Sequence, residues 1–517
     1  MKTSSRITLI LTTLIGTALF DILFWNEDWG INTLFYALFL LIALFLQKRN
    51  ISITSLITII GFILSSIAIT IFSSLLARWM YALSLILVAG TFHENQIKSI
   101  LNGFLNGVFN LVGGQISFFR NLFGKSYEEN KKKLRTKVFF VTSGIVLIFV
   151  ILFSIGNPIF GEQIGHILNY IGDLIVRFFE SISIVHILFI ILGLITSAAV
   201  IFKMRKSAIA RREATKSLTI NREQLKRKRR KKKTSAKKLK EEYRIVLWVF
   251  IMMNILTAIV NVIDINWLWF NFQLTEGMDL KQLVHEGTYI LIFSIILSSS
   301  LIVFYFRGNL NFFHKNKWLK LGANLWTFQN LILVISVAIR NYHYYHYFGL
   351  AYKRIGVVIF LVLTVFGLFT VFLKVNRNKS FYFLFNRNSL ATYILLIACS
   401  FVNWDAIIAK NNFNHPYPGN IEANFLLSLS DKTLPILEKH KEDFQNKNFL
   451  HNEYSLEILD ARIKDFIEEQ QLESFLSWSY ADSEAEKTLL QYIIKSDSID
   501  KTSYNRKFEQ REITRSK

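Results

Sequence analysis

Proline and cysteine are scarce in this sequence of 517 residues, which has four prolines and one cysteine. The single cysteine, Cys399, lies in an apolar run, so neither a disulfide framework nor a cysteine-based zinc site can form. All four prolines lie outside the apolar runs, which disfavours a transporter built on interrupted helices. The sequence also lacks a GxxxxGK[ST] phosphate loop, a GxSxG elbow and the kinase signatures. Together these absences favour a protein that is not an enzyme.

Apolar residues, in contrast, are abundant, with 52% hydrophobic and 15% aromatic residues. A soluble domain of this size rarely carries so large a share, so we expect lipid to be the solvent of the excess. A helix needs about 20 apolar residues to cross a bilayer core. The sequence therefore predicts an all-α fold, a polytopic transmembrane helix bundle of about eleven spans. The spans are expected at residues 7–25, 30–46, 51–76, 79–92, 138–156, 184–204, 245–264, 287–306, 321–339, 355–373 and 389–403.

The formal net charge of +23 is unevenly distributed among the loops. Basic loops occur at 48–49, 125–137, 203–244, 307–320 and 374–387, and acidic residues mark the loops between them. Since short loops rich in Lys and Arg stay in the cytoplasm, this alternation predicts a cytoplasmic N-terminus. With an odd number of spans, the C-terminal segment is expected on the other side of the membrane.

A basic block lies in the middle of the chain. Residues 203–244 carry 19 Lys and Arg against four Glu, with the run KRKRRKKK near the centre. We expect this run to bind anionic lipid headgroups, at about 1 kcal/mol per residue near the surface. One alternative is a solvated linker that fixes the topology, and another is nucleic acid, although no nucleic-acid motif accompanies the run and no specific nucleic acid is predicted. The predicted lipid-binding residues are Lys226, Arg227, Lys228, Arg229, Arg230, Lys231, Lys232 and Lys233.

These patterns divide the chain into four segments. We expect a first transmembrane half of about six spans at 1–204, a basic cytoplasmic linker at 205–244, a second half of about five spans at 245–403, and a small helical extramembrane domain with a loose tail at 404–517. Within the last segment, Ser483 with Glu486 is typical of a capping box at the start of a helix.

Two further stretches, 97–108 and 164–178, repeat apolar residues at helical spacing with polar residues between them. They predict amphipathic helices lying at opposite surfaces of the membrane, or alternatively helices packed on the bundle. Inside the spans, Asn254, Asn261 and Gln329 are expected to join helices by hydrogen bonds, as amides commonly do in lipid.

Polar residues of the second half gather on the side opposite the basic loops. A metal site built from its His, Glu and Asp residues is a weak alternative, because HEGTY lacks the second histidine of HExxH. We predict no catalytic residue, metal or cofactor, but a structural network in which Arg340 or Arg354 pairs with Glu286 or Asp405. The candidate functional surface comprises His285, Glu286, Arg340, His343, His346, Arg354, Asn403 and Asp405.

Four blocks of this sequence resemble a known family. They are VHEGTYILIFSIILS at 284–298, RNYHYYHYFGLAYKRIGV at 340–357, FVNWDAIIAKNNF at 401–413 and IEANFLLSLSDKTLPIL at 421–437. In order and spacing they resemble a bacterial family of multi-pass membrane proteins catalogued as a domain of unknown function, over about residues 245–440. The first half is similar only in being hydrophobic. The resemblance implies a helical membrane region followed by a helix-rich C-terminal segment, and it brings no catalytic residues.

The leading hypothesis is a non-enzymatic sensor, scaffold or assembly factor in the bacterial inner membrane, with the lipid bilayer and an envelope protein as its partners. One alternative is a transporter of a small solute or lipid, which the number of spans and the amides within them favour. The other is a membrane-embedded enzyme at the outer surface, using His285, Glu286 or Asp405 as acid or base.

Overall fold

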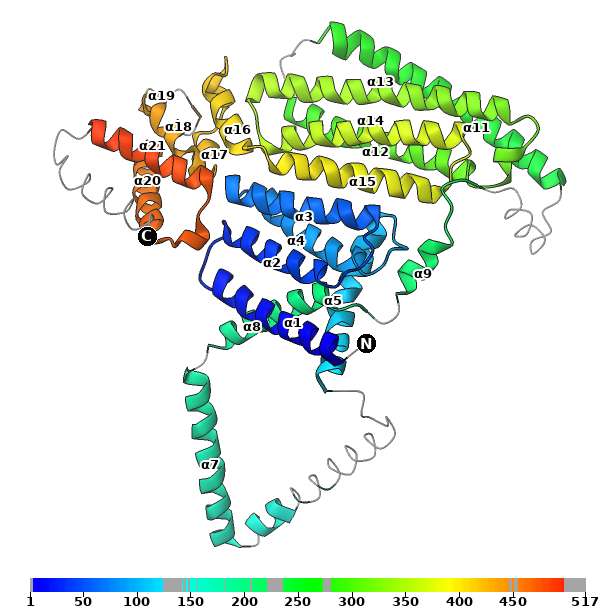
Figure 1. The fold of residues 1–517 in the computed structure, drawn as a ribbon. Helices are drawn as coiled ribbons and strands as arrows, with labels where there is room; N and C mark the ends of the chain where they lie inside the picture. Colours follow the sequence, from blue (N-terminus) through cyan, green and yellow to red (C-terminus); the bar gives the residue numbers. More distant parts are fainter. Residues whose placement is uncertain are drawn as a thin grey trace.

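Helices are the elements of this fold throughout the part of the chain that the structure describes, and only two isolated β-bridges accompany them. The structure, a computed structural model, describes residues 3–123, 142, 146, 149–155, 157–181, 183–204, 207–220, 236–272, 280–445, 449–450 and 454–496. The all-α prediction is confirmed for these residues. Figure 1 shows two stacked groups of helices with the C-terminal helices at one end of both.

The first half is built on six packed helices. They are α1 (Thr3–Phe24), α2 (Asn32–Phe45), α3 (Ile53–Phe72), α4 (Leu75–Thr91), α5 (Ile100–Phe123) and α8 (Ile184–Ile201). Serine side chains cap the starts of three of them, since the hydroxyls of Ser52, Ser74 and Ser183 accept from amides three residues on. Such caps satisfy amides that the helix itself leaves unpaired.

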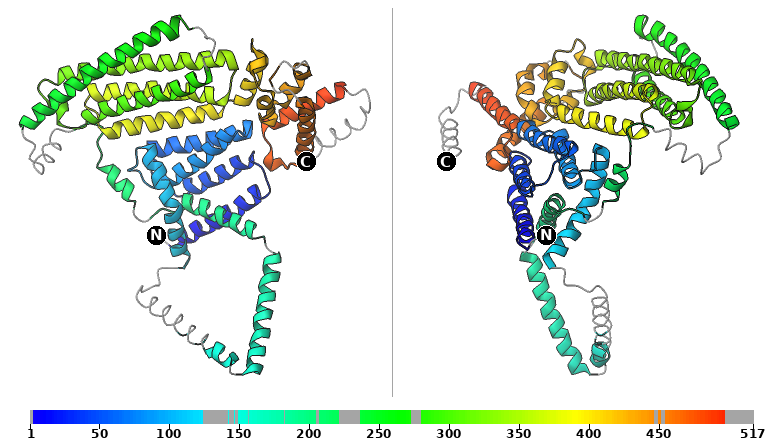
Figure 2. Two further views of the ribbon diagram at one scale, coloured as in Figure 1. Left: turned by 180° about the vertical axis from the view of Figure 1, so that it is seen from behind. Right: turned by 45° about the vertical axis from the view of Figure 1, so that its right-hand side comes forward.

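Two helices of this part of the chain do not belong to that packed group. In both views of Figure 2, α7 (Pro158–Ser181) extends away from the bundle, and the short α9 (Ala208–Ala214) lies between the two halves. The helix predicted at 164–178 is therefore present in α7, and its place at a membrane surface stays a prediction. The helix predicted at 97–108 forms the start of α5, which packs against α4 and α8.

The second half is arranged around α13. Its helices are α11 (Ala236–Asp264) with the π-helical continuation η1 (Ile265–Phe270), α12 (Leu280–Tyr305), α13 (Asn316–Phe348), α14 (Tyr352–Asn376) and α15 (Phe381–Ser400). Helices α11, α12 and α14 each pack on α13, and α15 packs on α14. The other side of α15 contacts α3, α4 and α5, so this one helix joins the two halves (Figure 1).

The C-terminal unit, Trp404–Ser496, has its own apolar core. Its helices are α16 (Trp404–Phe413), η3 (Pro418–Asn420), α17 (Ala423–Leu427), η4 (Asp431–Thr433), α18 (Leu434–Lys439), α19 (Lys441–Gln445), α20 (Ser455–Leu472), η5 (Phe475–Ser477) and α21 (Tyr480–Ser496). Leu434, Leu459 and Leu489, from three of these helices, are fully buried together. The capping box expected at Ser483 is wrong, because α21 begins at Tyr480 and the hydroxyl of Ser479 accepts from the amide of Asp482.

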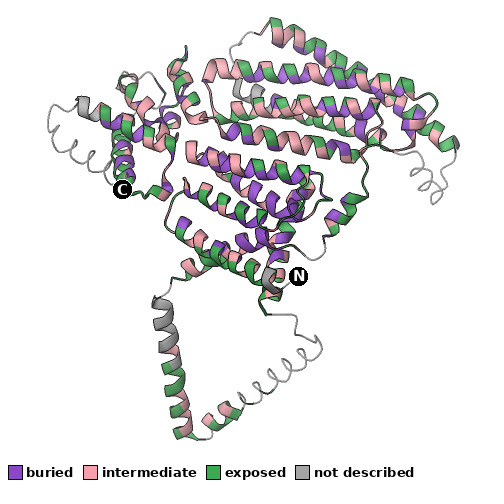
Figure 3. Cartoon of the chain, viewed as in Figure 1, coloured by how far each residue is buried: buried purple, intermediate pink, exposed green. Residues whose placement is uncertain are grey.

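Seven helices of the described chain are long and apolar enough to cross a membrane, or eight if α15 and α16, bent by 63°, count as one span. Two predicted spans, α2 and α4, are shorter apolar helices, and most of the run 138–156 lies outside the described residues. The count of eleven therefore stays a prediction. Exposed residues cover the outer faces of the bundle in Figure 3, and many are large and apolar, such as Val262, Phe293 and Phe328. Lipid is the solvent that suits such faces.

Candidate functional site

Except for α5, which lies across the ends of α4 and α8, the packed helices of both halves run between the same two ends (Figure 1). We call one end the basic end, where Lys48, Lys203, Arg307 and Lys379 follow or precede the helices. The other is the docking end, where the C-terminal unit meets the bundle. Many of the polar contacts between helices lie at these two ends.

At the docking end, the C-terminal unit is hydrogen-bonded to the first half. The amide of Ile31 donates to the carbonyl of Trp478 over 3.1 Å. Ser477 accepts from the amide of Asp28 over 2.8 Å and donates to the Glu27 carboxylate over 2.7 Å. Gly30 permits this approach, because a Cβ there would overlap the carbonyl oxygen of Ser477. The loop between α1 and α2 therefore binds η5 and the residue that follows it.

The same unit is also hydrogen-bonded to the second half. The fully buried Asn412 of α16 accepts from the amide of Leu350 over 2.6 Å and donates to its carbonyl over 2.9 Å. Its neighbour Asn411 donates to the Tyr345 hydroxyl over 3.0 Å. The side-chain amide of Asn412 thus satisfies both backbone groups of Leu350. These two hydrogen bonds fix the turn between α13 and α14 to the C-terminal unit.

Asp405, a predicted site residue, lies among charges of the C-terminal unit. One of its carboxylate oxygens accepts from Ser430 over 2.6 Å, and the other is buried without a hydrogen-bond partner. Burial lowers the pKa of the nearby Lys432, and the carboxylates of Asp482 and Asp405 oppose that shift. Asn403, also predicted, caps α16 by accepting from the amide of Ala406 over 3.1 Å.

Neither Arg340 nor Arg354 pairs with Asp405, and the alternative partner Glu286 has a side chain outside the described residues, so that pairing stays a prediction. Arg340 pairs with Asp264 at the end of α11, over 2.7 Å, and both side chains are less than a tenth exposed. Arg354 donates to the carbonyls of Phe348 and Gly349 and lies over the ring of Tyr344. The side chains of His285 and Glu286 lie outside the described residues, and their backbone belongs to the first turns of α12.

The two predicted histidines of α13 lie among aromatic rings. His343 stacks on Phe272 with ring centres 4.1 Å apart and lies 3.3 Å from the carbonyl of Leu268. His346 lies edge-on to Tyr417, 5.5 Å between centres. Within the described residues, no three His, Cys, Asp or Glu side chains come together as a metal site would require. The predicted surface therefore divides into an aromatic belt on α13 and a charged group around Asp405.

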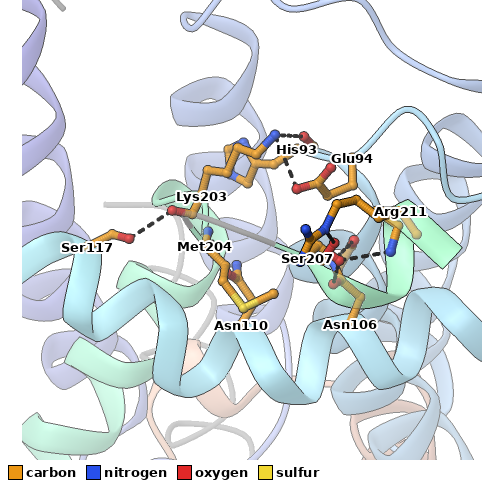
Figure 4. Close-up of polar contacts among 12 residues, drawn as sticks. His93, Glu94, Asn106, Asn110, Ser117, Lys203, Met204, Ser207 and Arg211 are labelled. Carbon is orange, nitrogen blue, oxygen red and sulfur yellow. Dashed lines mark hydrogen bonds and ion pairs between the residues drawn. The ribbon is translucent and has the colours of Figure 1, made fainter.

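The basic end holds a polar cluster that the sequence reading missed (Figure 4). The buried His93 ring lies 2.8 Å from the carbonyl of Val200, and burial lowers the pKa of His93 to about 3. The imidazole is therefore neutral and donates to this carbonyl. Lys203 binds the carbonyl of His93 over 3.0 Å and the Glu94 carboxylate over 3.1 Å. These contacts tie the end of α8 to the end of α4.

Two asparagines on α5 complete this cluster, as Figure 4 shows. Asn110 donates to the carbonyls of Ala199 and Phe202 and accepts from the amide of Met204. Asn106 donates to the carbonyl of Gly90 over 2.7 Å and accepts from Ser207 over 2.6 Å. Helix ends leave carbonyls unpaired, and these amides satisfy them where α4 and α8 stop. The spacing GxxNGxxN in α5 is the sequence signal that could have revealed this face.

Residues 207–220, the described start of the predicted linker, contact both halves at the basic end. The Glu213 carboxylate accepts from the amide of Lys98 over 3.1 Å and from the hydroxyl of Tyr382. Thr219 forms an antiparallel bridge with Lys379 of the second half. The run Lys226–Lys233 lies outside the described residues, so lipid binding there stays a prediction.

The long apolar helices with apolar outer faces define a multi-pass α-helical integral membrane protein. The family described as "Domain of unknown function (DUF4153)" matches residues 10–440, and the chain belongs to this family. The match begins in α1, so the family likeness extends through the first half, which the sequence reading had credited with hydrophobicity alone. It ends just after α18, before α20 and α21. No curated protein and no solved structure matches the chain.

Proposed function

We propose that this protein is a non-enzymatic scaffold and sensor of the bacterial envelope, whose C-terminal unit transmits the binding of an envelope partner to the cytoplasmic side. The observation that carries the proposal is the double attachment of this unit. Trp478 is bonded to Ile31 in the first half, and Asn412 is bonded to Leu350 in the second. A partner that displaces the unit therefore acts on both halves at once.

The orientation follows from charge. Lys48, Lys203, Arg307 and Lys379 all lie at the basic end. Because basic loops resist translocation, this end and the N-terminus face the cytoplasm, and the docking end with the C-terminal unit faces outward from the inner membrane.

Residues 207–220, at the basic end, are the segment that would respond to movement of the C-terminal unit at the docking end. They touch the first half at Lys98 and the second half at Lys379 and Tyr382. Helices are stiff, so a change in how the halves meet at one end must be accommodated at the other. The segment continues into the basic run, whose attachment to anionic lipid would then change with the position of the halves.

A disulfide across the bridge at the basic end tests this coupling. Cys399→Ser removes the native cysteine, and Thr219→Cys with Lys379→Cys then places two thiols on bridged residues, about 5 Å apart between Cα atoms, within disulfide range. Ser477→Ala with Asn412→Ala weakens the docking end. We expect the two weakening substitutions to change the rate of disulfide formation in membranes several-fold, relative to the protein that carries only the introduced thiols.

Matched controls are Ser428→Ala and Asn414→Ala, which remove exposed side chains of the same unit that bond only within it. Limited proteolysis of the C-terminal unit reports whether it has been released. Release with an unchanged disulfide rate would refute the coupling. No release would refute the claim that these two side chains hold the unit to both halves.

A further inference from the structure

A deep groove opens between three helices of the second half. It has a volume of about 930 Å³ and is lined by α12, α14 and α15. Helices α12 and α15 both pack against α14, and the groove occupies the space between them. All three helices belong to the apolar bundle, so the groove faces lipid rather than water.

The groove covers one half of the bilayer. Its lining on α12 runs from Ile295 to Arg307, where the chain reaches the basic end. The helical part of this lining ends at Tyr305, so ten steps of about 1.5 Å extend about 15 Å, and half of a hydrocarbon core of about 30 Å is also about 15 Å. The groove therefore has the length of one acyl chain in the leaflet at the basic end.

Three polar residues of the lining are already hydrogen-bonded within the protein. Thr364 donates to the carbonyl of Phe360, and Ser389 to the carbonyl of Asn386. The amide of Asn388 donates to Thr370 over 2.9 Å. Since these groups bond to their own or neighbouring helices, what remains toward the groove is mainly hydrocarbon from residues such as Val303 and Leu384.

Positive charge lies at the mouth of the groove. Arg307 is exposed, its guanidinium lies 3.7 Å from the ring centre of Phe304, and no carboxylate pairs with it among the described residues. Behind it, the fully buried Lys374 donates to the carbonyl of Phe306 over 2.7 Å and has no described acidic partner. An exposed arginine in the lining, without a counter-ion among the described residues, favours an anion at this point.

We propose that this groove binds one anionic glycerophospholipid of the leaflet at the basic end, with an acyl chain along α14 and the phosphate at Arg307. The bound lipid fills a space between α12 and α15 that protein side chains leave open. This site is separate from the predicted basic run and does not depend on the sensor role.

The experiment uses the full chain in detergent after delipidation, titrated with dioleoylphosphatidylglycerol or dioleoylphosphatidylethanolamine and followed by native mass spectrometry. Phosphatidylglycerol should bind more tightly. Arg307→Gln should weaken its binding about tenfold, the scale of one charge-assisted hydrogen bond, and weaken that of phosphatidylethanolamine less, because the ammonium group of that lipid already offsets the charge of its phosphate. Arg377→Gln, an exposed arginine of the same end outside the lining, is the matched control and should have no effect.

A second pair of variants tests the groove itself. Gly367 lines it, and a Cβ there would have only an ordinary contact with Asn388, so Gly367→Leu projects into the groove and should reduce binding of both lipids. Gly356→Leu changes the same helix at an open position and should not. Equal binding of the two lipids, or equal behaviour within either variant pair, would overturn the proposal. So would a dimer that Gly367→Leu abolishes, because the occupant would then be a second copy.

Discussion

The two transmembrane halves use different chemistry to hold apolar helices together in the same solvent. In the first half, small residues let backbones approach, and hydroxyls such as Ser55 and Thr58 bond to Thr91 across helices. Large aromatic side chains are fully buried in both halves, Tyr36 and Phe62 in the first and Trp326 and Phe250 in the second, so the halves differ in how their helices meet and not in aromatic content. The close helix packing of the first half leaves little space for helix movement. The second half contains the groove between α12, α14 and α15 and buries charged side chains.

Buried amides join helices in both halves, as Asn106 and Asn110 do in the first. The second half joins α11 to α13 through Asn254 and Gln329, 3.0 Å apart, and through the donation of Asn261 to the carbonyl of Gln329, which confirms the predicted amide contacts. It also buries the Asp264–Arg340 pair. We infer that the first half is the fixed frame and the second half the part suited to binding and movement.

The largest effect is expected from Asp264→Ala, which leaves Arg340 buried without its counter-ion. Breaking a buried pair from one side costs about 3–5 kcal/mol, and two further donors of Arg340 already lack partners. Thermal unfolding in detergent should show this loss. The double change Asp264→Leu with Arg340→Met should recover most of it, because no charge then remains buried. A double variant as unstable as the single one would contradict this account.

A smaller effect, about 1–3 kcal/mol, is expected from Gly90→Ala in the first half. A Cβ at Gly90 would overlap the carbonyl oxygen of Gly103 and lie 2.5 Å from the amide nitrogen of Gly107, so α4 and α5 must separate. Gly356→Ala, at an open position of the second half, is the control and should be neutral or slightly stabilising. The same thermal assay decides between them, and equal stability of the two variants would refute close packing as the principle of the first half.

The sequence predicted where the helices lie along the chain, but it did not predict which residues of different helices contact one another. The runs 184–204 and 245–264 lie in α8 and α11, because apolar length is what a bilayer selects. The contact between Arg340 and Asp264 was not predicted, since span order gives the depth of a residue and not the side on which its helix faces. The contact between Ile31 and Trp478 joins residues with no local pattern to connect them.

Helix α5 shows a second limit of the sequence. Its predicted apolar stripe includes Leu101, Leu105 and Val108, which are exposed in the described structure, while Asn106 and Gly107 are buried. In water the apolar side of a helix turns inward, but in lipid small and amide residues gain more from contact with other helices. Amphipathic spacing therefore predicted the helix correctly and left its orientation open.

Lowering the pH should destabilise the first half, where His93 is buried. The pKa of His93 is about 3 in the fold, and an unfolded histidine has a pKa of about 6.5, so below pH 6.5 only the unfolded state takes up the proton. The stability that His93 contributes is complete above about pH 6.5 and falls by about 1.4 kcal/mol per unit as the pH drops toward 3.

Hydrogen exchange at pH 7 and 5.5, corrected for intrinsic rates, should show faster opening of residues 86–100 at the lower pH. His93→Gln should remove the difference, since glutamine cannot be protonated in this range. A pH effect that persists in this variant would place its origin elsewhere.

The smallest effects should come from the serine caps, and here the two halves should behave alike. Ser74 caps α4 in the first half, and Ser380 caps α15 in the second, each by accepting from the amide three residues on. An N-cap serine contributes about 1 kcal/mol in either setting, because it satisfies an amide of the first turn and does not depend on how the helix faces are packed. Ser74→Ala and Ser380→Ala should therefore each lower thermal stability by about this amount, and Ser380→Ala slightly more, because the Ser380 hydroxyl also donates to the carbonyl of Ser217 over 2.6 Å. A loss several-fold larger in one half would show that packing chemistry reaches the helix ends, and the contrast between the halves would then extend beyond their cores.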